Sequence, residues 1–133
     1  QTLMHEIRDE SGYQVSELSV LQVLQPPHLE TAVVHPAPFS SNTHNVGNGH
    51  FHSDWCYGFV AADRPSGSVA SGESTDVRWC TVAELRSLAE EGVCLHDIID
   101  IYEFLVSNVS SFQQYPCAQY SLKKPAHGET VIP

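Results

Sequence analysis

Apolar residues near the start of the chain recur at the spacing that is typical of one helical face. Leu3, Met4 and Ile7 follow one another at intervals of one, three and four residues, which predicts a helix over residues 1–11. Gly12 stands where a glycine commonly follows the end of a helix. We therefore expect a first helix that ends just before Gly12.

Two further helices are expected in the second half of the chain. Thr81 is followed three residues later by Glu84, which is the pattern of a capping box at the start of a helix. This helix should run to about Glu91 and end before Gly92. A longer helix is expected over residues 95–109, because its apolar residues fall on one face. That face comprises Ile98, Ile99, Tyr102, Leu105, Val106 and Val109.

Strands are predicted where β-branched and aromatic residues gather. Prolines follow the first two such stretches, and the third, HFHSDWCYGFVAA, is the richest in aromatic residues. The four predicted strands are residues 15–25, 29–35, 50–62 and 75–80. Residues 39–49 and 63–72 are expected to be loops, because turn-forming residues dominate them.

The order of helix, strands and helices predicts an α+β fold around a mixed sheet. A chain of 133 residues has room for one ordinary domain. We place this domain at residues 1–109. Residues 110–133 contain scattered Pro, Gly and Gln without a sustained period, so we expect an irregular C-terminal tail there.

Charge and cysteine content narrow the classes of function. The net charge is −10 and only six residues are Lys or Arg, so binding of duplex nucleic acid is not expected. An acidic chain can still act on phosphorylated substrates when divalent cations bridge the two. The four cysteines form no C-x-x-C pair, which favours reduced, structural cysteines and a cytoplasmic location. The apolar runs are too short for a membrane span, so no membrane partner is expected.

The first predicted helix carries three acidic residues at i, i+3 and i+4: Glu6, Asp9 and Glu10. These positions share one side of a helix, where like charges repel one another. A divalent cation such as Mg²⁺ removes that repulsion and binds phosphate oxygens as well, which suits attack on a phosphate anhydride. The alternative is a solvated acidic face, which is common on protein surfaces.

Residues 5–13, HEIRDESGY, resemble the second half of the signature of the Nudix hydrolases. That signature ends in Arg-Glu-apolar-any-Glu-Glu-any-Gly-apolar. Glu6 matches its first clustered acid, Asp9 and Glu10 match the pair, and Gly12 matches the glycine; both apolar positions are filled. There are two departures. His5 stands where the family has an Arg that orients a carboxylate, and Asp9 is one methylene shorter than the usual Glu.

Later blocks of the chain also resemble Nudix domains. These blocks are residues 29–38, 50–54 and 73–85. In all, the resemblance covers roughly residues 2–106. It implies an α/β/α sandwich with a mixed central sheet. By the same comparison, the chain lacks the first strands and the first turn of the catalytic helix. The sheet edge left unpaired would invite pairing with another chain, including a homodimer.

The resemblance implies a hydrolase that cleaves the pyrophosphate bond of a nucleoside diphosphate linked to another moiety. Glu6, Asp9 and Glu10 are then the ligands of Mg²⁺ or Mn²⁺, with Asp9 and Glu10 also counted as catalytic. Glu73, in the loop before residues 75–80, is a third catalytic candidate as the general base, with Asp76 a weaker one. An exposed loop acid is the alternative for Glu73. For the whole protein, the alternative is a catalytically impaired Nudix-like module that binds a nucleotide or a protein.

Three polar residues, His50, His52 and Asp54, alternate along the aromatic-rich strand and so point to one side of it. We expect this side to line the substrate cleft, with His52 and Asp54 in contact with substrate. The alternative is a zinc or iron site completed by His35 or His44. Tyr57 is a candidate for stacking on a nucleobase. The alternative for Tyr57 is packing in the core.

Overall fold

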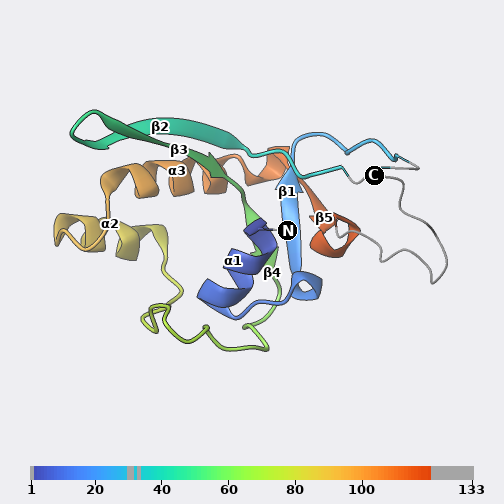
Figure 1. Cartoon of the computed structure of the whole chain (residues 1–133), viewed down its shortest axis with the longest axis horizontal. Helices are drawn as coiled ribbons and strands as arrows, with labels where there is room; N and C mark the ends of the chain where they lie inside the picture. Colours follow the sequence, from blue (N-terminus) through green and yellow to red (C-terminus); the bar gives the residue numbers. More distant parts are fainter. Residues whose placement is uncertain (1, 30–31, 33, 121–133) are drawn as a thin grey trace.

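The computed structural model describes residues 2–29, 32 and 34–120, and it is α+β (Figure 1). The helices of this part are α1 (Thr2–Ser11), α2 (Val82–Glu90) and α3 (His96–Ser107). The strands are β1 (Leu18–Gln22), β2 (Ser40–Gly47), β3 (His50–Cys56), β4 (Phe59–Ala61) and β5 (Gln113–Pro116). Short 3₁₀ helices are η1 (Val15–Glu17), η2 (Val109–Ser111) and η3 (Cys117–Tyr120).

The strands form two separate sheets. In the first, β1 lies between β4 and β5, and both of its neighbours run antiparallel to it. In the second, β2 and β3 form an antiparallel hairpin in which His44 lies opposite His52. Every strand pair in the described residues is antiparallel, so the mixed sheet predicted from the sequence is wrong for this part of the chain.

The core lies where α1 and η3 meet the first sheet. Tyr13, Leu18, Val20 and Cys117 form its buried cluster, and Val20 and Cys117 are fully buried. Apolar side chains of α1 pack against this cluster. The hydroxyl of Tyr13 donates a hydrogen bond to the carbonyl oxygen of Asp63 at 2.8 Å, which satisfies its polar end. The hydrophobic effect therefore fixes α1 on β1.

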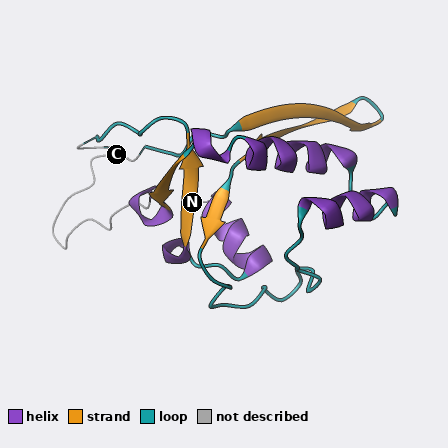
Figure 2. Ribbon diagram, turned by 180° about the vertical axis from the view of Figure 1, so that it is seen from behind, coloured by secondary structure: helices purple, strands orange, loops and turns teal. Residues whose placement is uncertain are grey.

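The three predicted helices are confirmed within one or two residues at their ends. Gly12 and Gly92 have φ angles of 78° and 74°, the left-handed conformation that ends a helix. The capping box of α2 is present, because Thr81 and Glu84 each accept a hydrogen bond from the backbone N–H of the other. Figure 2 shows α2 and α3 side by side. None of the helices in the described ranges has the length and hydropathy needed to cross a bilayer.

The predicted strands are only partly confirmed. Of residues 15–25, the first three form η1 and only Leu18–Gln22 pair as a strand. Residues 50–62 divide into β3 and β4 at Gly58, where a Cβ would lie 2.9 Å from a methyl carbon of Leu105. The predictions for 75–80 and for the described part of 29–35 are wrong, because these segments pair with no strand in the described residues. Strand propensity without a neighbouring strand does not make a sheet.

Two segments that lacked a strand pattern are strands. Residues 39–49 were expected to be a loop, but Ser40–Gly47 form β2 because β3 supplies its hydrogen-bonding partners. Residues 110–133 were expected to be an irregular tail, but Gln113–Pro116 form β5 on β1, and Cys117 enters the core. Residues 121–133 of that predicted tail lie outside the described residues.

Candidate functional site

Helix α1 carries the predicted acidic residues, and the structure divides them into two sets. Asp9 lies between two basic side chains: Arg8 Nη2 is 2.9 Å from Asp9 Oδ1, and His5 Nε2 is 3.4 Å from Asp9 Oδ2. Glu6 and Glu10 are exposed, and their carboxylates make no hydrogen bond or ion pair within the described residues. The two glutamates are thus accessible to a ligand, whereas Asp9 is already engaged.

Arg8 is a residue that the sequence pattern did not single out. Its Nε donates to Asp9 Oδ1 at 3.0 Å, and its Nη2 lies 3.1 Å from His5 Nδ1. The resemblance placed a carboxylate-orienting Arg at the position of His5; here Arg8 and His5 together contact Asp9. A basic residue directly before the acidic pair was the signal that could have revealed this contact.

The loop after β4 is held against the C-terminal end of α1. The N–H of Gly67 donates to the carbonyl oxygen of Gly12 at 3.1 Å, and the N–H of Ala70 donates to that of Asp9 at 2.7 Å. A Cβ on Gly12 would lie 2.7 Å from the oxygen of Gly67. The two backbones can approach this closely only because both residues are glycines.

Glu17 fastens the same loop from the other side. Its carboxylate accepts hydrogen bonds from the N–H groups of Gln14 at 2.7 Å and Ser66 at 3.0 Å. These bonds favour the charged form and lower the pKa of Glu17, with the bond from Gln14 the largest cause. No local sequence pattern predicts this contact, because Glu17 and Ser66 lie 49 positions apart.

Glu73, the predicted general base, follows this anchored loop. Its N–H donates to the carbonyl oxygen of Ala70 at 3.2 Å, and Ala70 in turn donates to Asp9. The backbone of Glu73 is therefore joined to α1 through two successive hydrogen bonds, while its side chain is exposed. Asp76, the weaker candidate, lies 3.3 Å from Arg78 Nη2. Of the two acids, Glu73 is the one with an uncommitted carboxylate in the described residues.

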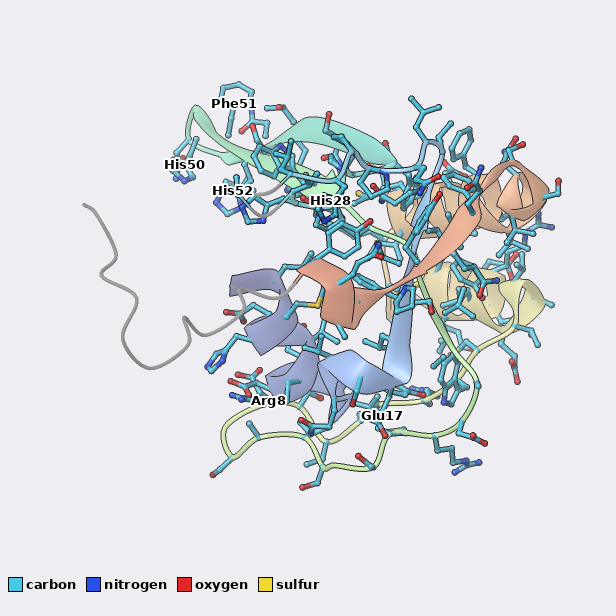
Figure 3. All side chains as sticks on the ribbon, turned by 90° about the vertical axis from the view of Figure 1, so that its right-hand side faces the viewer. Arg8, Glu17, His28, His50, Phe51 and His52 are labelled. Carbon is cyan, nitrogen blue, oxygen red and sulfur yellow. The ribbon has the colours of Figure 1, made fainter. Side chains whose placement is uncertain are left out.

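The predicted substrate contacts do not lie with these acids in one cavity. His52 and Asp54 are exposed on the hairpin, where Asp54 Oδ2 is 3.2 Å from His44 Nδ1. Tyr57 lies beyond the end of β3, half-buried beside Phe59, with ring centroids 6.5 Å apart. Figure 3 shows His50 and His52 on the hairpin and Arg8 on α1, in separate parts of the molecule.

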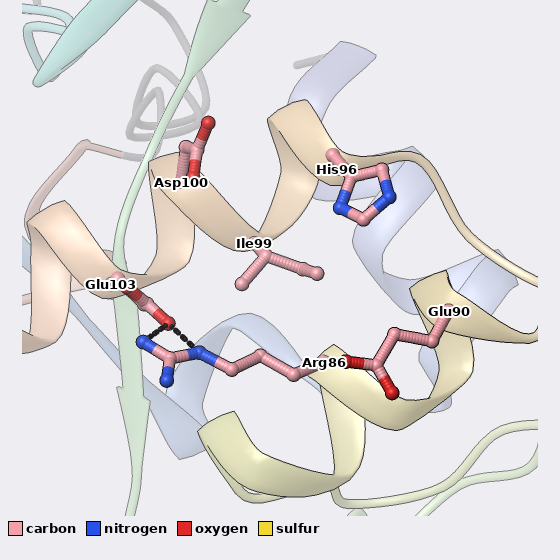
Figure 4. A pocket seen from close by; sticks show the side chains of 6 residues that line it. All are labelled: Arg86, Glu90, His96, Ile99, Asp100 and Glu103. Carbon is pink, nitrogen blue, oxygen red and sulfur yellow. Dashed lines mark hydrogen bonds and ion pairs between the residues drawn. The ribbon is translucent and has the colours of Figure 1, made fainter.

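Two cavities of the described part lie elsewhere. One of about 250 Å³ lies between α2 and α3 (Figure 4), where Arg86 Nε donates to Glu103 Oε1 at 2.6 Å. It is lined by Arg86, Glu90, His96, Ile99, Asp100 and Glu103. A second, of about 220 Å³, adjoins the end of β1 and is mostly apolar. None of the predicted site residues lines either cavity.

The carboxylates of α1 can be compared with the donor atoms that Mg²⁺ requires. In the described ranges, no three His, Cys, Asp or Glu side chains are placed to hold a metal ion together. Mg²⁺ does not require three, because it commonly binds one or two carboxylates and takes its other ligands from water and substrate phosphates. Glu6 and Glu10, one helical turn apart, provide such a pair of hard oxygen donors. Glu6 and Glu10 therefore have donor atoms of the kind that Mg²⁺ accepts, whereas Asp9 is engaged by Arg8 and His5.

No protein-family model, curated protein or solved structure matches the chain. Its function is therefore inferred from the residues and their geometry.

Proposed function

We propose that the protein is a Nudix-type hydrolase that cleaves the pyrophosphate bond of a nucleoside diphosphate linked to a second group, with Mg²⁺ or Mn²⁺ as cofactor. The proposal includes the α/β/α sandwich that the resemblance implies. The observation that carries it is the exposure of Glu6 and Glu10 on adjacent turns of α1. The loop that leads to Glu73 is hydrogen-bonded to the same helix, which supports the role of Glu73.

Each acidic residue has a distinct role in this proposal. Glu6 and Glu10 hold the divalent ion, which, when bound, neutralises the diphosphate and lowers the pKa of the attacking water. Asp9, which is contacted by Arg8 and His5, positions the C-terminal turn of α1 rather than binding the ion directly. Glu73 accepts the proton of the attacking water at its carboxylate.

The remaining predicted residues contact the substrate in this proposal. His52 and Asp54 bind polar groups of the substrate, and the ring of Tyr57 stacks on the base. The exposure of the hairpin supports access to His52 and Asp54. Tyr57 is half-buried, so part of this residue is accessible to a ligand.

Hydrolysis assays on the intact protein test the proposal. The probes are ADP-ribose and UDP-glucose, which are nucleoside diphosphates linked to a second group, and the readout is release of AMP or UMP. We expect Mg²⁺-dependent release that falls at least about tenfold in Glu6→Gln and in Glu10→Gln, because each variant removes one ion ligand. Glu91→Gln removes an exposed acid just past α2 and serves as the matched control. Full activity in Glu6→Gln would refute the assignment.

The contacts of Asp9 favour a second candidate function, a nucleotide-binding module without catalysis. If Arg8 and His5 keep Asp9 from taking part in ion binding, the site retains two carboxylates and less negative charge. Calorimetry with ADP-ribose in saturating Mg²⁺ separates the two functions. Binding without release of AMP would support the module, and release of AMP would support the hydrolase.

A further inference from the structure

Strand β2 forms an open edge of the hairpin. The hairpin sheet has two strands, so the side of β2 that faces away from β3 has no strand partner within the described residues. No residue of β2 is buried, and the strand runs along the upper margin of the molecule in Figure 1. The backbone N–H and C=O groups on this side of β2 can therefore pair with a further strand.

The other edge strands of the described part are protected in ways that β2 is not. Strand β4 has three residues, β5 has four and ends at Pro116, and β3 carries Asp54. Short length, proline and charged side chains are the common means by which proteins prevent pairing at a sheet edge. Strand β2 has eight residues and contains no Pro, Asp, Glu, Lys or Arg. Its register shifts between Asn45 and Gly47, so residues 40–45 form the regular, unprotected part of the edge.

The distribution of charge favours a second copy of the chain as the partner of this edge. The net charge is −10, so two copies repel one another over their acidic segments. Residues 31–53, which include β2, contain no Asp, Glu, Lys or Arg and form the longest such stretch of the chain. Contact through β2 therefore brings two copies together where repulsion is least. A basic partner, in contrast, would be drawn to the acidic segments rather than to β2.

We propose that two copies of the chain associate through β2, antiparallel and about a two-fold axis, into a four-stranded sheet of order β3–β2–β2–β3. A two-fold axis brings the same surface of each copy into contact, which suits a strand that pairs with its own counterpart. A two-stranded hairpin is marginally stable by itself, and two further strands stabilise it. When the pairing is centred on residues 40–45, Thr43 lies within one position of its counterpart in the second copy.

This dimer goes beyond the proposed hydrolysis and does not depend on it. The residues proposed to bind Mg²⁺ lie on α1, and His52 and Asp54 lie on β3, which remains an outer strand of the four-stranded sheet. Self-association is measured without substrate or metal ion. A failure of the hydrolysis assay therefore leaves the dimer untouched, and a monomeric chain leaves the hydrolase untouched.

Sedimentation velocity of the full chain, from micromolar to near-millimolar concentration, tests the inference. We expect a reversible equilibrium of monomer and dimer, because paired strands alone make a small interface. Thr43→Lys should weaken the dimer about tenfold, since the two lysines lie close together across the interface. Ser53→Lys is the matched control: Ser53 lies opposite Thr43 on β3, and the same hydroxyl contact is lost. Both variants change the net charge equally, and Ser53→Lys should associate as the original chain does.

Amide hydrogen exchange at low and high protein concentration locates the contact. Residues 40–47 should exchange more slowly at high concentration, whereas α1 should not change. Added NaCl should strengthen the dimer, because salt screens the repulsion between two acidic chains. A chain that stays monomeric at every concentration would overturn the inference and leave this edge to a strand of a different protein. Equal dissociation constants for the two lysine variants, or slower exchange confined to another segment, would overturn it too.

Discussion

The sheet β4–β1–β5 and the hairpin β2–β3 are both antiparallel, yet they differ in what surrounds their side chains. Four of the five residues of β1 are buried, including Val20, which has no exposed surface. Almost every residue of the hairpin is exposed, including Phe51 and Trp55. We therefore expect the packing of the first sheet to contribute more to the free energy of unfolding than the hairpin does. The hairpin instead presents a set of titratable side chains to solvent.

Truncating one apolar side chain in each region would test this contrast most strongly. Leu18→Ala removes buried methyl groups beside Tyr13 and Val20, and should lower the free energy of unfolding by about 2–5 kcal/mol. Phe51→Ala removes a larger side chain, but one that is already exposed, and should cost less than about 0.5 kcal/mol. Urea unfolding followed by circular dichroism measures both. Equal losses would show that the hairpin is packed in solution.

Gly12 and Gly92, which follow α1 and α2, have similar backbone conformations, so the cost of alanine can be compared between them. Both have φ near +75°, so alanine at either position carries a strain of about 1–2 kcal/mol. Only Gly12 also faces a backbone, since nothing lies within 4 Å of a Cβ on Gly92. We expect Gly12→Ala to lower the free energy of unfolding by about 3 kcal/mol and Gly92→Ala by about 1 kcal/mol. Similar values for the two variants would mean that the Gly12–Gly67 contact is not formed.

Buried Cys117 makes the stability of the core depend on pH. Burial raises the pKa of its thiol from 9.0 to about 11. Between these values the unfolded chain loses this proton while the folded chain keeps it, so stability falls as pH rises. The fall contributed by Cys117 should reach at most about 1.4 kcal/mol per pH unit. Below pH 9 its contribution is fully present.

Unfolding measured from pH 8 to pH 11 isolates this contribution. Cys117→Ala should show a shallower decline than the original chain, even though it is less stable overall. Val46→Ala removes an exposed side chain of the hairpin that does not titrate, and should keep the original slope. Burial also raises the pKa values of Tyr13 and Tyr120, so some decline remains in every variant. Identical slopes in Cys117→Ala and Val46→Ala would contradict the burial of Cys117.

The same contrast explains which elements could be predicted from the sequence. The helices carry local signals: the Thr81–Glu84 capping box and a glycine after α1 and α2. Strand β1 could be predicted, because its buried positions hold apolar residues that are visible in the sequence. Strand β2 has none, because neither face is buried, and its Asn, Ser and Gly residues resemble a loop. Its structure comes from pairing with β3, and such pairing cannot be read from one segment alone.

The candidate site, too, could be predicted from the sequence only in part. The spacing of Glu6, Asp9 and Glu10 predicted a shared helix, and α1 confirms the helix. The spacing did not predict that Arg8 and His5 would contact Asp9 and separate it from the glutamates. The anchoring of the Glu73 loop depends on Gly12, Gly67 and Glu17, which are distant in sequence. Tertiary contacts of this kind leave no local pattern.

Direct binding of Mn²⁺ tests the central claim, that α1 holds a divalent ion through Glu6 and Glu10. Mn²⁺ replaces Mg²⁺ as the probe, and the loss of its free paramagnetic resonance signal reports binding without any need for turnover. We expect the original chain and Glu91→Gln to bind Mn²⁺ equally. Glu6→Gln and Glu10→Gln should bind at least about tenfold more weakly. Equal binding by all four proteins would contradict the account.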